Sequence, residues 1–96
     1  MIGIDTSAKI ILNYYGQQKQ EVQAVQELSE LILLLAARED QRKSNYKEHV
    51  TEEIADSLIM IEQIRLANGI SDKDINAVIV QKISRQFNRI SEETGK

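Results

Sequence analysis

The chain has 96 residues, a formal net charge of −3, no cysteine and no proline. This length fits a single domain, residues 1–96, and the missing cysteines exclude disulfides and thiolate metal sites. The slight acidic balance argues against a general nucleic-acid-binding protein, which normally carries a basic excess. Because proline is absent and only four glycines are present, long helices are favoured over a sandwich or barrel. We therefore predict an all-α protein.

The first half of the chain predicts two helices. The first helix begins near residues 5–7, where three consecutive residues can cap it, and Gly16 interrupts or ends it. The second helix runs from about residue 17 to residue 38, and its segment 31–37 is apolar on all sides. A helix without a polar face has to be enclosed by protein, so we expect this segment to form the centre of the core.

A third helix is expected over residues 46–68, after a polar loop over residues 39–44. Asn45 and Glu48 have the spacing of a capping box at its start. The pair Asn68-Gly69 is a favourable C-terminal stop, because both residues tolerate the left-handed conformation. If the loop folds back, the second and third helices form an antiparallel hairpin.

The fourth expected helix starts between Ser71 and Asp74 and continues to about Glu92. Its apolar stripe consists of Ile75, Ile79, Ile83, Phe87 and Ile90. A chain of this length buries only about 60–65 % of the surface that its unfolded form exposes. We therefore expect the helices to pack together and the chain to self-associate.

No membrane association is expected from the sequence. The N-terminus lacks a basic region followed by a long apolar run. Residues 31–37, the most hydrophobic stretch, are far fewer than the roughly 18–20 apolar residues of a membrane span. We expect a soluble, cytoplasmic protein that binds neither membranes nor nucleic acid.

Two pairs of acidic residues continue apolar helix faces. Glu27 and Glu30 are three residues apart on the second helix, and Glu53 and Asp56 are three apart on the third, so each pair shares a face. At 1.5 Å per residue, an antiparallel hairpin brings Glu30 opposite Glu53 and Glu27 opposite Asp56. Carboxylates in such places are costly unless they are paired or bind a metal.

This acidic cluster predicts a divalent cation site. Four close negative charges repel one another in a low-dielectric setting, so a cation is expected among them. Only oxygen ligands are offered, which favours Mg²⁺, or Mn²⁺, over zinc or copper. Magnesium bridges carboxylates to phosphates, and this suggests metal-assisted phosphoanhydride hydrolysis. On the fourth helix Lys82, Arg85 and Arg89 form a basic stripe that suits triphosphate oxygens, although such residues also oppose the helix dipole or simply face water.

The motifs resemble those of the MazG-type nucleotide pyrophosphohydrolases, an all-α family. Its signature, Glu-Glu-x-x-Glu followed by Glu-x-x-Asp, is similar to residues 26–30 and 53–56, and its basic run is similar to residues 82–87. The first acid of the signature is Gln26 in this chain. The resemblance implies that Mg²⁺ is held, and catalysis served, by four acids: Glu27, Glu30, Glu53 and Asp56. It also implies that Lys82 and Arg85 bind substrate phosphates. The fold that it implies is a four-helix bundle completed by homo-oligomerisation, as a homodimer or homotetramer.

Two functions follow as hypotheses. The first is a metal-dependent enzyme that hydrolyses a nucleoside triphosphate to the monophosphate and pyrophosphate, clearing unwanted nucleotides. The second is a catalytically weak or inactive helical oligomer that serves as an interaction module, with Gln26 marking the loss of activity. The four remaining carboxylates favour the enzyme, because an inactive relative has no reason to keep costly buried acids.

Overall fold

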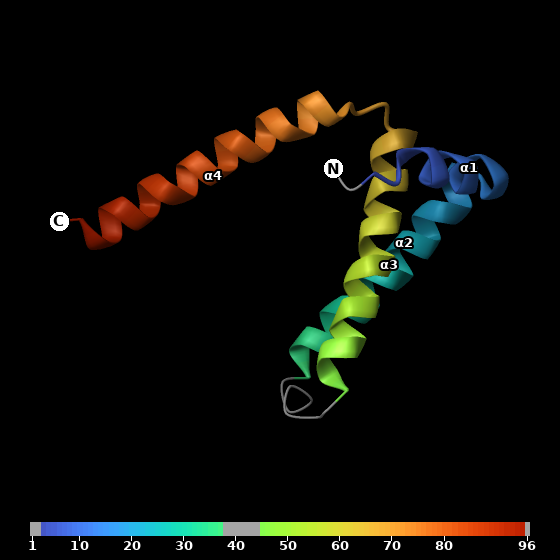
Figure 1. The fold of residues 1–96 in the computed structure, drawn as a ribbon, viewed down its shortest axis with the longest axis horizontal. Coiled ribbons are helices and arrows are strands. Elements are labelled where there is room, and N and C mark those ends of the chain that lie inside the picture. Colours follow the sequence, from blue (N-terminus) through green and yellow to red (C-terminus); the bar gives the residue numbers. More distant parts are fainter. Residues whose placement is uncertain (1–2, 38–44, 96) are drawn as a thin grey trace.

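The computed structural model describes residues 3–37 and 45–95, which form four helices and no strand (Figure 1). The helices are α1 (Asp5–Tyr15), α2 (Gln17–Ala36), α3 (Tyr46–Ala67) and α4 (Asp72–Thr94). The all-α class is therefore confirmed. The expected loop over residues 39–44 and the expected last residue of the second helix, at position 38, lie outside the described residues. No helix in the described ranges is long and apolar enough to cross a bilayer.

Helix ends follow local chemistry in most places. Gly16 separates α1 from α2 with φ of 90°, and Gly69 follows α3 with φ of 65°, a conformation that side chains disfavour. Ser71 caps α4, because its Oγ accepts a hydrogen bond from the Asp74 backbone N–H at 3.1 Å. The capping box expected at Asn45 is wrong. The Asn45 side chain makes no cap hydrogen bond and its Nδ2 instead lies 3.5 Å from His49 Nε2.

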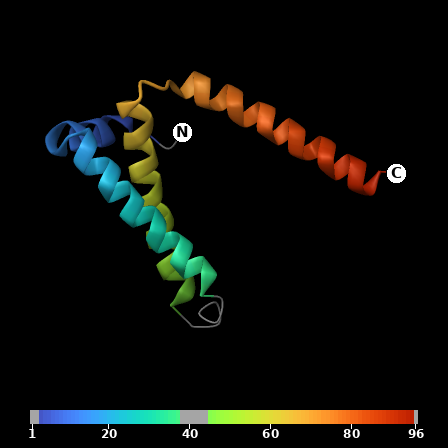
Figure 2. The ribbon, with the colours of Figure 1, turned by 180° about the vertical axis from the view of Figure 1, so that it is seen from behind.

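Helices α2 and α3 form the predicted antiparallel hairpin, and α1 packs across one end of it (Figures 1 and 2). Small or flexible apolar side chains fill the core, namely Ala8, Ala24 and Met60. Polar side chains are buried with them. Gln20 Nε2 donates a hydrogen bond to Gln63 Oε1 at 2.8 Å, which joins α2 to α3 and satisfies both buried amides in part.

The expectation that residues 31–37 form the centre of the core is wrong for a single chain. Ile32, Leu33 and Leu35 are 64 %, 67 % and 49 % exposed. The reason is the position of α1, which packs at the other end of the hairpin and leaves this part of α2 with α3 as its neighbour (Figure 1). The apolar end of α2 therefore presents an uncovered surface.

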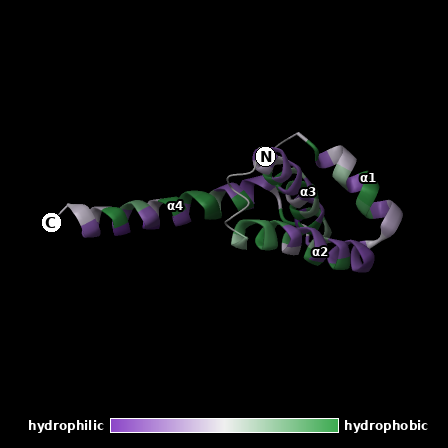
Figure 3. Cartoon of the chain, turned by 90° about the horizontal axis from the view of Figure 1, so that it is seen from below, coloured by the Kyte–Doolittle hydropathy of each residue, from purple (hydrophilic) through white to green (hydrophobic). Residues whose placement is uncertain are grey.

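Helix α4 points away from the other three helices (Figures 1 and 2). Among the described residues α4 does not pack along α1, α2 or α3, although Asp72 at its start lies close to Arg65 of α3, and it buries none of its own residues. Hydrophobic residues nevertheless recur along its whole length (Figure 3). A single chain thus packs three helices together, and the four-helix bundle remains a prediction about an assembly.

Candidate functional site

Three acidic side chains converge where α2 faces α3. Carboxylate oxygens of Glu27 and Glu30, from α2, and of Glu53, from α3, all lie within 4.8 Å of one another. The i, i+3 spacing puts the two α2 acids on one face, and the antiparallel hairpin brings Glu53 to the same level. We call these three residues the acid cluster. The structure thus brings together three of the four acids that the sequence indicated.

Asp56, the fourth acid, lies at the margin. Its side chain is exposed, and it is not among the three residues whose oxygens converge. It is still close enough to Glu53 for its negative charge to raise the pKa of that residue. The negative charge of Asp56 therefore acts on the acid cluster, although its oxygens do not converge with the other three.

Glu53 is the most perturbed member of the acid cluster. Partial burial raises its pKa first, and the charges of Glu30, Asp56 and Glu27 raise it further. Its Oε2 atom is buried and has no hydrogen-bond partner. No lysine or arginine in the described residues pairs with any of the three acids. The arrangement is electrostatically costly, and a bound cation or a proton would relieve that cost.

A glutamine that the sequence reasoning missed supports the cluster. Gln23 Nε2 donates a hydrogen bond to Glu27 Oε1 at 2.8 Å. The signal was available, because Gln23 lies one helical turn before Glu27 and residues four apart are neighbours. The bond holds one carboxylate oxygen and leaves the other for a ligand. Gln26, by contrast, is exposed and is not part of the cluster.

A groove of about 400 Å³ opens beside Glu30 and Glu53. Its other lining residues come from one end of the hairpin, where α2 ends and α3 begins: Leu33, Leu34, Ala37, His49 and Glu52. The acid cluster therefore has an open side that combines apolar surface from α2 with polar groups from α3. Such a groove is large enough for part of a small ligand.

The basic residues of α4 lie elsewhere. Lys82, Arg85 and Arg89 border a shallow depression of about 140 Å³ on α4 itself, together with Gln86. Because α4 does not pack against α2 or α3 among the described residues, a single chain does not bring these side chains to the acid cluster. We call Lys82, Arg85 and Arg89 the basic face of α4.

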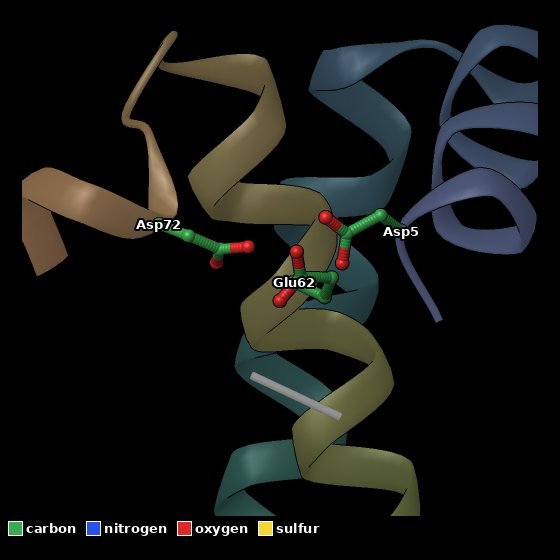
Figure 4. A group of neighbouring side chains, drawn as sticks. All are labelled: Asp5, Glu62 and Asp72. Carbon is green, nitrogen blue, oxygen red and sulfur yellow. The ribbon is translucent and has the colours of Figure 1, made fainter. Parts of the chain in front are cut away.

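A second group of acids, Asp5, Glu62 and Asp72, converges from three helices (Figure 4). The guanidinium of Arg65 forms ion pairs with all three. Arg65 is 7 % exposed, its Nε and Nη2 both donate to Glu62 Oε1, and the Nε–Oε1 distance is 2.8 Å. The hydrogen bond with Glu62 is the largest influence on the Arg65 pKa, which is raised. This group already contains its cation, so it is a structural ion-pair network. The acid cluster differs from it in this respect.

Arg65 also fixes the direction in which α4 leaves α3. Its Nη2 lies 3.2 Å from Asp5 Oδ2 at the start of α1, and its Nε lies 3.6 Å from Asp72 Oδ1 at the start of α4. Its Nη1 donates to the Ile70 carbonyl in the linker. One buried guanidinium thereby ties three helices together. The sequence reasoning missed this network, although Glu62 and Arg65 have helical i, i+3 spacing.

We expect the metal-free protein to gain thermal stability when the pH falls from neutral to mildly acidic. The fold raises the pKa of Glu53 above its value in the unfolded chain, so the folded state binds that proton more readily. The stabilisation is complete below the unfolded pKa and is lost as the pH rises through the folded pKa. The measurement is the Tm in EDTA between about pH 7.5 and about pH 5, with Glu53→Gln as reference. A difference between the two proteins that does not change with pH would contradict the expectation.

No family profile, curated protein or solved structure matches the chain. Its function therefore has to be inferred from its own residues.

Proposed function

We propose that the chain is a Mg²⁺-dependent hydrolase that splits a nucleoside triphosphate into the monophosphate and pyrophosphate. The observation that carries the proposal is the convergence of Glu27, Glu30 and Glu53, whose oxygens lie within 4.8 Å of one another. Acidic groups are common without a metal. Here the buried, unpartnered Oε2 of Glu53 and the absence of a paired cation in the described residues favour a bound ion.

The donor set suits magnesium. All three ligands are carboxylate oxygens, which Mg²⁺ and Mn²⁺ prefer. Oxygens around octahedral Mg²⁺ at about 2.1 Å are about 3.0 to 4.2 Å apart. Carboxylate oxygens within 4.8 Å of one another therefore need only small side-chain rotations to share one ion. Magnesium normally keeps several waters, which leaves coordination positions for substrate phosphates.

The metal, the acid cluster and the basic residues of α4 each have a separate role in the proposed reaction. When bound, Mg²⁺ would polarise phosphate oxygens and lower the pKa of a water. In the proposed reaction a water molecule attacks the α-phosphorus, the bond from the α-phosphorus to the bridging oxygen breaks, and pyrophosphate leaves with the electron pair. A carboxylate of the acid cluster takes the water proton. Lys82 and Arg85 offset the charge that develops on the leaving pyrophosphate.

In the proposed complex the nucleoside part of the substrate binds in the groove beside the acid cluster. Leu33 and Leu34 offer apolar surface for a base or sugar, and His49 and Glu52 offer hydrogen-bonding groups at the same groove. Phosphates at the acid cluster and a nucleoside in the groove are adjacent, because Glu30 and Glu53 belong to both. This adjacency is what a nucleotide substrate requires.

We propose a homodimer or homotetramer as the active form. The apolar end of α2 and the apolar stripe of α4 are uncovered in the single chain, with Ile32 at 64 % and Phe87 at 66 % exposed. Large exposed apolar patches mark interaction surfaces. The same surface favours the alternative function, a helical oligomer that works as an interaction module without turnover.

The test of the proposed function is pyrophosphate release from a panel of common and modified nucleoside triphosphates. Magnesium-dependent release of pyrophosphate together with the matching monophosphate, abolished by EDTA, is the expected result. A folded oligomer that releases no pyrophosphate from any member of the panel would support the interaction module.

Millimolar Mg²⁺ should raise the Tm of the wild-type chain. Binding to the folded state at a tenfold excess over Kd adds about 1.4 kcal/mol, which corresponds to roughly 5–10 °C for a domain of this size. Glu53→Gln should show little shift, because it removes a ligand of the acid cluster. Equal shifts in the two proteins, measured against EDTA, would place the ion elsewhere.

A further inference from the structure

We propose that the groove beside the acid cluster selects guanine, so that the substrate is a guanine nucleoside triphosphate. This inference rests on the proposed function and names the base that Glu52 and His49 recognise. It follows from the position of the groove next to the acid cluster, from the apolar and polar walls of the groove, and from the hydrogen-bonding groups of the polar wall.

The wall formed by α2 is apolar and continues from the acid cluster. Leu33, Leu34 and Ala37 line the groove. They lie three, four and seven residues after Glu30, on the helix face that Glu30 shares. Leu33 is 67 % exposed, so its side chain is accessible to a planar ring. From Glu30 to Ala37 the helix rises about 10 Å, a length that suits a ribose and a base extending from phosphates at the acid cluster.

The wall formed by α3 carries the hydrogen-bonding groups. His49 and Glu52 line the groove, and their three-residue spacing puts them on one face of α3. Both residues are exposed, and no lysine or arginine among the described residues pairs with the Glu52 carboxylate. Glu53, the next residue, belongs to both the groove and the acid cluster. Groups able to recognise the edge of a base therefore lie beside the site proposed for the phosphates.

The chemistry of these two side chains decides which base fits. An ionised carboxylate only accepts hydrogen bonds, and its two oxygens match two adjacent donors. An imidazole carries at least one N–H donor whether it is neutral or protonated. Guanine has the complementary edge, because its 2-amino group and its N1–H are adjacent donors and its O6 is an acceptor. Glu52 accepts the two donors, and His49 donates to O6.

The other bases lack this pattern. Adenine and cytosine each have one amino donor next to a ring nitrogen that is an acceptor. Uracil and thymine have a single N–H donor between two carbonyl acceptors. A carboxylate opposite an acceptor makes no hydrogen bond, and sites whose polar groups are left unpaired discriminate strongly against the wrong ligand. We therefore expect guanine nucleotides to be preferred over those of the other four bases.

The test begins with the base preference of the wild type, measured as kcat/KM for pyrophosphate release with Mg²⁺. In whichever sugar series the chain accepts, the guanine substrate should have the highest kcat/KM. The hypoxanthine substrate differs from the guanine substrate only by the missing 2-amino group. Its kcat/KM should be about 10- to 100-fold lower, which is the cost of one hydrogen bond to a charged group. Equal values for these two substrates would overturn the inference.

Glu52→Gln should remove most of the guanine preference. Its amide has one acceptor and one donor, so it pairs with only one of the two adjacent guanine donors. The ratio of kcat/KM for the guanine substrate to that for the uracil substrate should fall about 10- to 100-fold. A structural defect would lower both values alike, and an unchanged ratio would overturn the inference. Glu48→Gln, the same change at an exposed residue that does not line the groove, should keep the wild-type ratio.

A pair of variants tests the donor at the other side of the guanine edge. His49→Ala removes the donor to O6 and should lower the ratio of guanine to uracil kcat/KM. His49→Gln retains an N–H donor and should keep more of that ratio. A wild-type ratio in His49→Ala would overturn the role assigned to His49.

A second readout does not depend on turnover. The α,β-methylene analogues of the guanine and uracil substrates keep the edge of the base and resist cleavage at the α-phosphorus. In calorimetric titrations with Mg²⁺ the wild type should bind the guanine analogue more tightly, and Glu52→Gln should lose that difference. A wild type that shows the difference but releases no pyrophosphate would overturn the enzyme and retain the guanine site. An active wild type without a guanine preference would retain the enzyme and overturn the inference.

Discussion

Glu53→Gln should lower pyrophosphate release by more than about 100-fold, since even groups that only orient metal ligands account for about 10- to 100-fold. The same substitution should leave the Tm in EDTA unchanged or higher. Glu53 is partly buried among three other acids, and its pKa is raised for that reason. A neutral amide of the same shape removes the repulsion and can donate to Glu30. Loss of activity together with retained stability is the signature of a site residue.

The matched control is Glu48→Gln, which makes the same chemical change at an exposed position in the first turn of the same helix. It should keep activity near the wild-type value and should not raise the Tm, because an acid in the first turn interacts favourably with the helix dipole. Steady-state pyrophosphate release and calorimetry on both variants complete the comparison. Wild-type turnover in Glu53→Gln would remove this residue from the catalytic site.

Arg65→Met should strongly destabilise the fold. It leaves Glu62, whose side chain is 0 % exposed, without its charged partner, and an uncompensated buried charge is strongly unfavourable. It also releases the contacts to Asp5, Asp72 and the linker carbonyl. We expect the Tm to fall by roughly 10 °C or more. Thermal unfolding followed by circular dichroism measures the change.

The double variant Glu62→Gln/Arg65→Met provides the control. Replacing both members of a buried ion pair is often nearly neutral, whereas removing one member is not. The double variant should therefore recover a large part of the lost Tm. A double variant as unstable as Arg65→Met would mean that the contacts of Arg65 to α1 and α4 are responsible for the stability.

The local features of this chain could be predicted from the sequence, because they depend on neighbours within one or two helical turns. Gly16, Gly69 and the Ser71 cap mark helix ends in the structure, and each acts through the conformation or hydrogen bonding of its own turn. The approach of Glu30 to Glu53 also followed from spacing. Once two helices are antiparallel, the rise of 1.5 Å per residue fixes which residues lie level.

Features that depend on which surfaces meet could not be predicted in this way. The apolar segment 31–37 looked like the centre of a core, but α1 packs at the other end of the hairpin and leaves Leu33 67 % exposed. The hydropathy of a helix face indicates that the face has to be covered, but it does not indicate which other surface covers it. The buried hydrogen bond between Gln20 and Gln63 joins residues 43 positions apart. No pattern among neighbouring residues predicts it, because it depends on which helix surfaces meet.

The sequence by itself determined four helices, their approximate boundaries and the level at which the acids of α2 and α3 meet. Only the tertiary structure decided that one set of acids surrounds Arg65 and contains its own cation, while the acid cluster contains none among the described residues. It also decided that α4 leaves the hairpin and keeps Lys82 and Arg85 away from the acids of its own chain. Helical spacing orders side chains within one element, whereas long-range contacts and the direction of a linker fix how elements are placed.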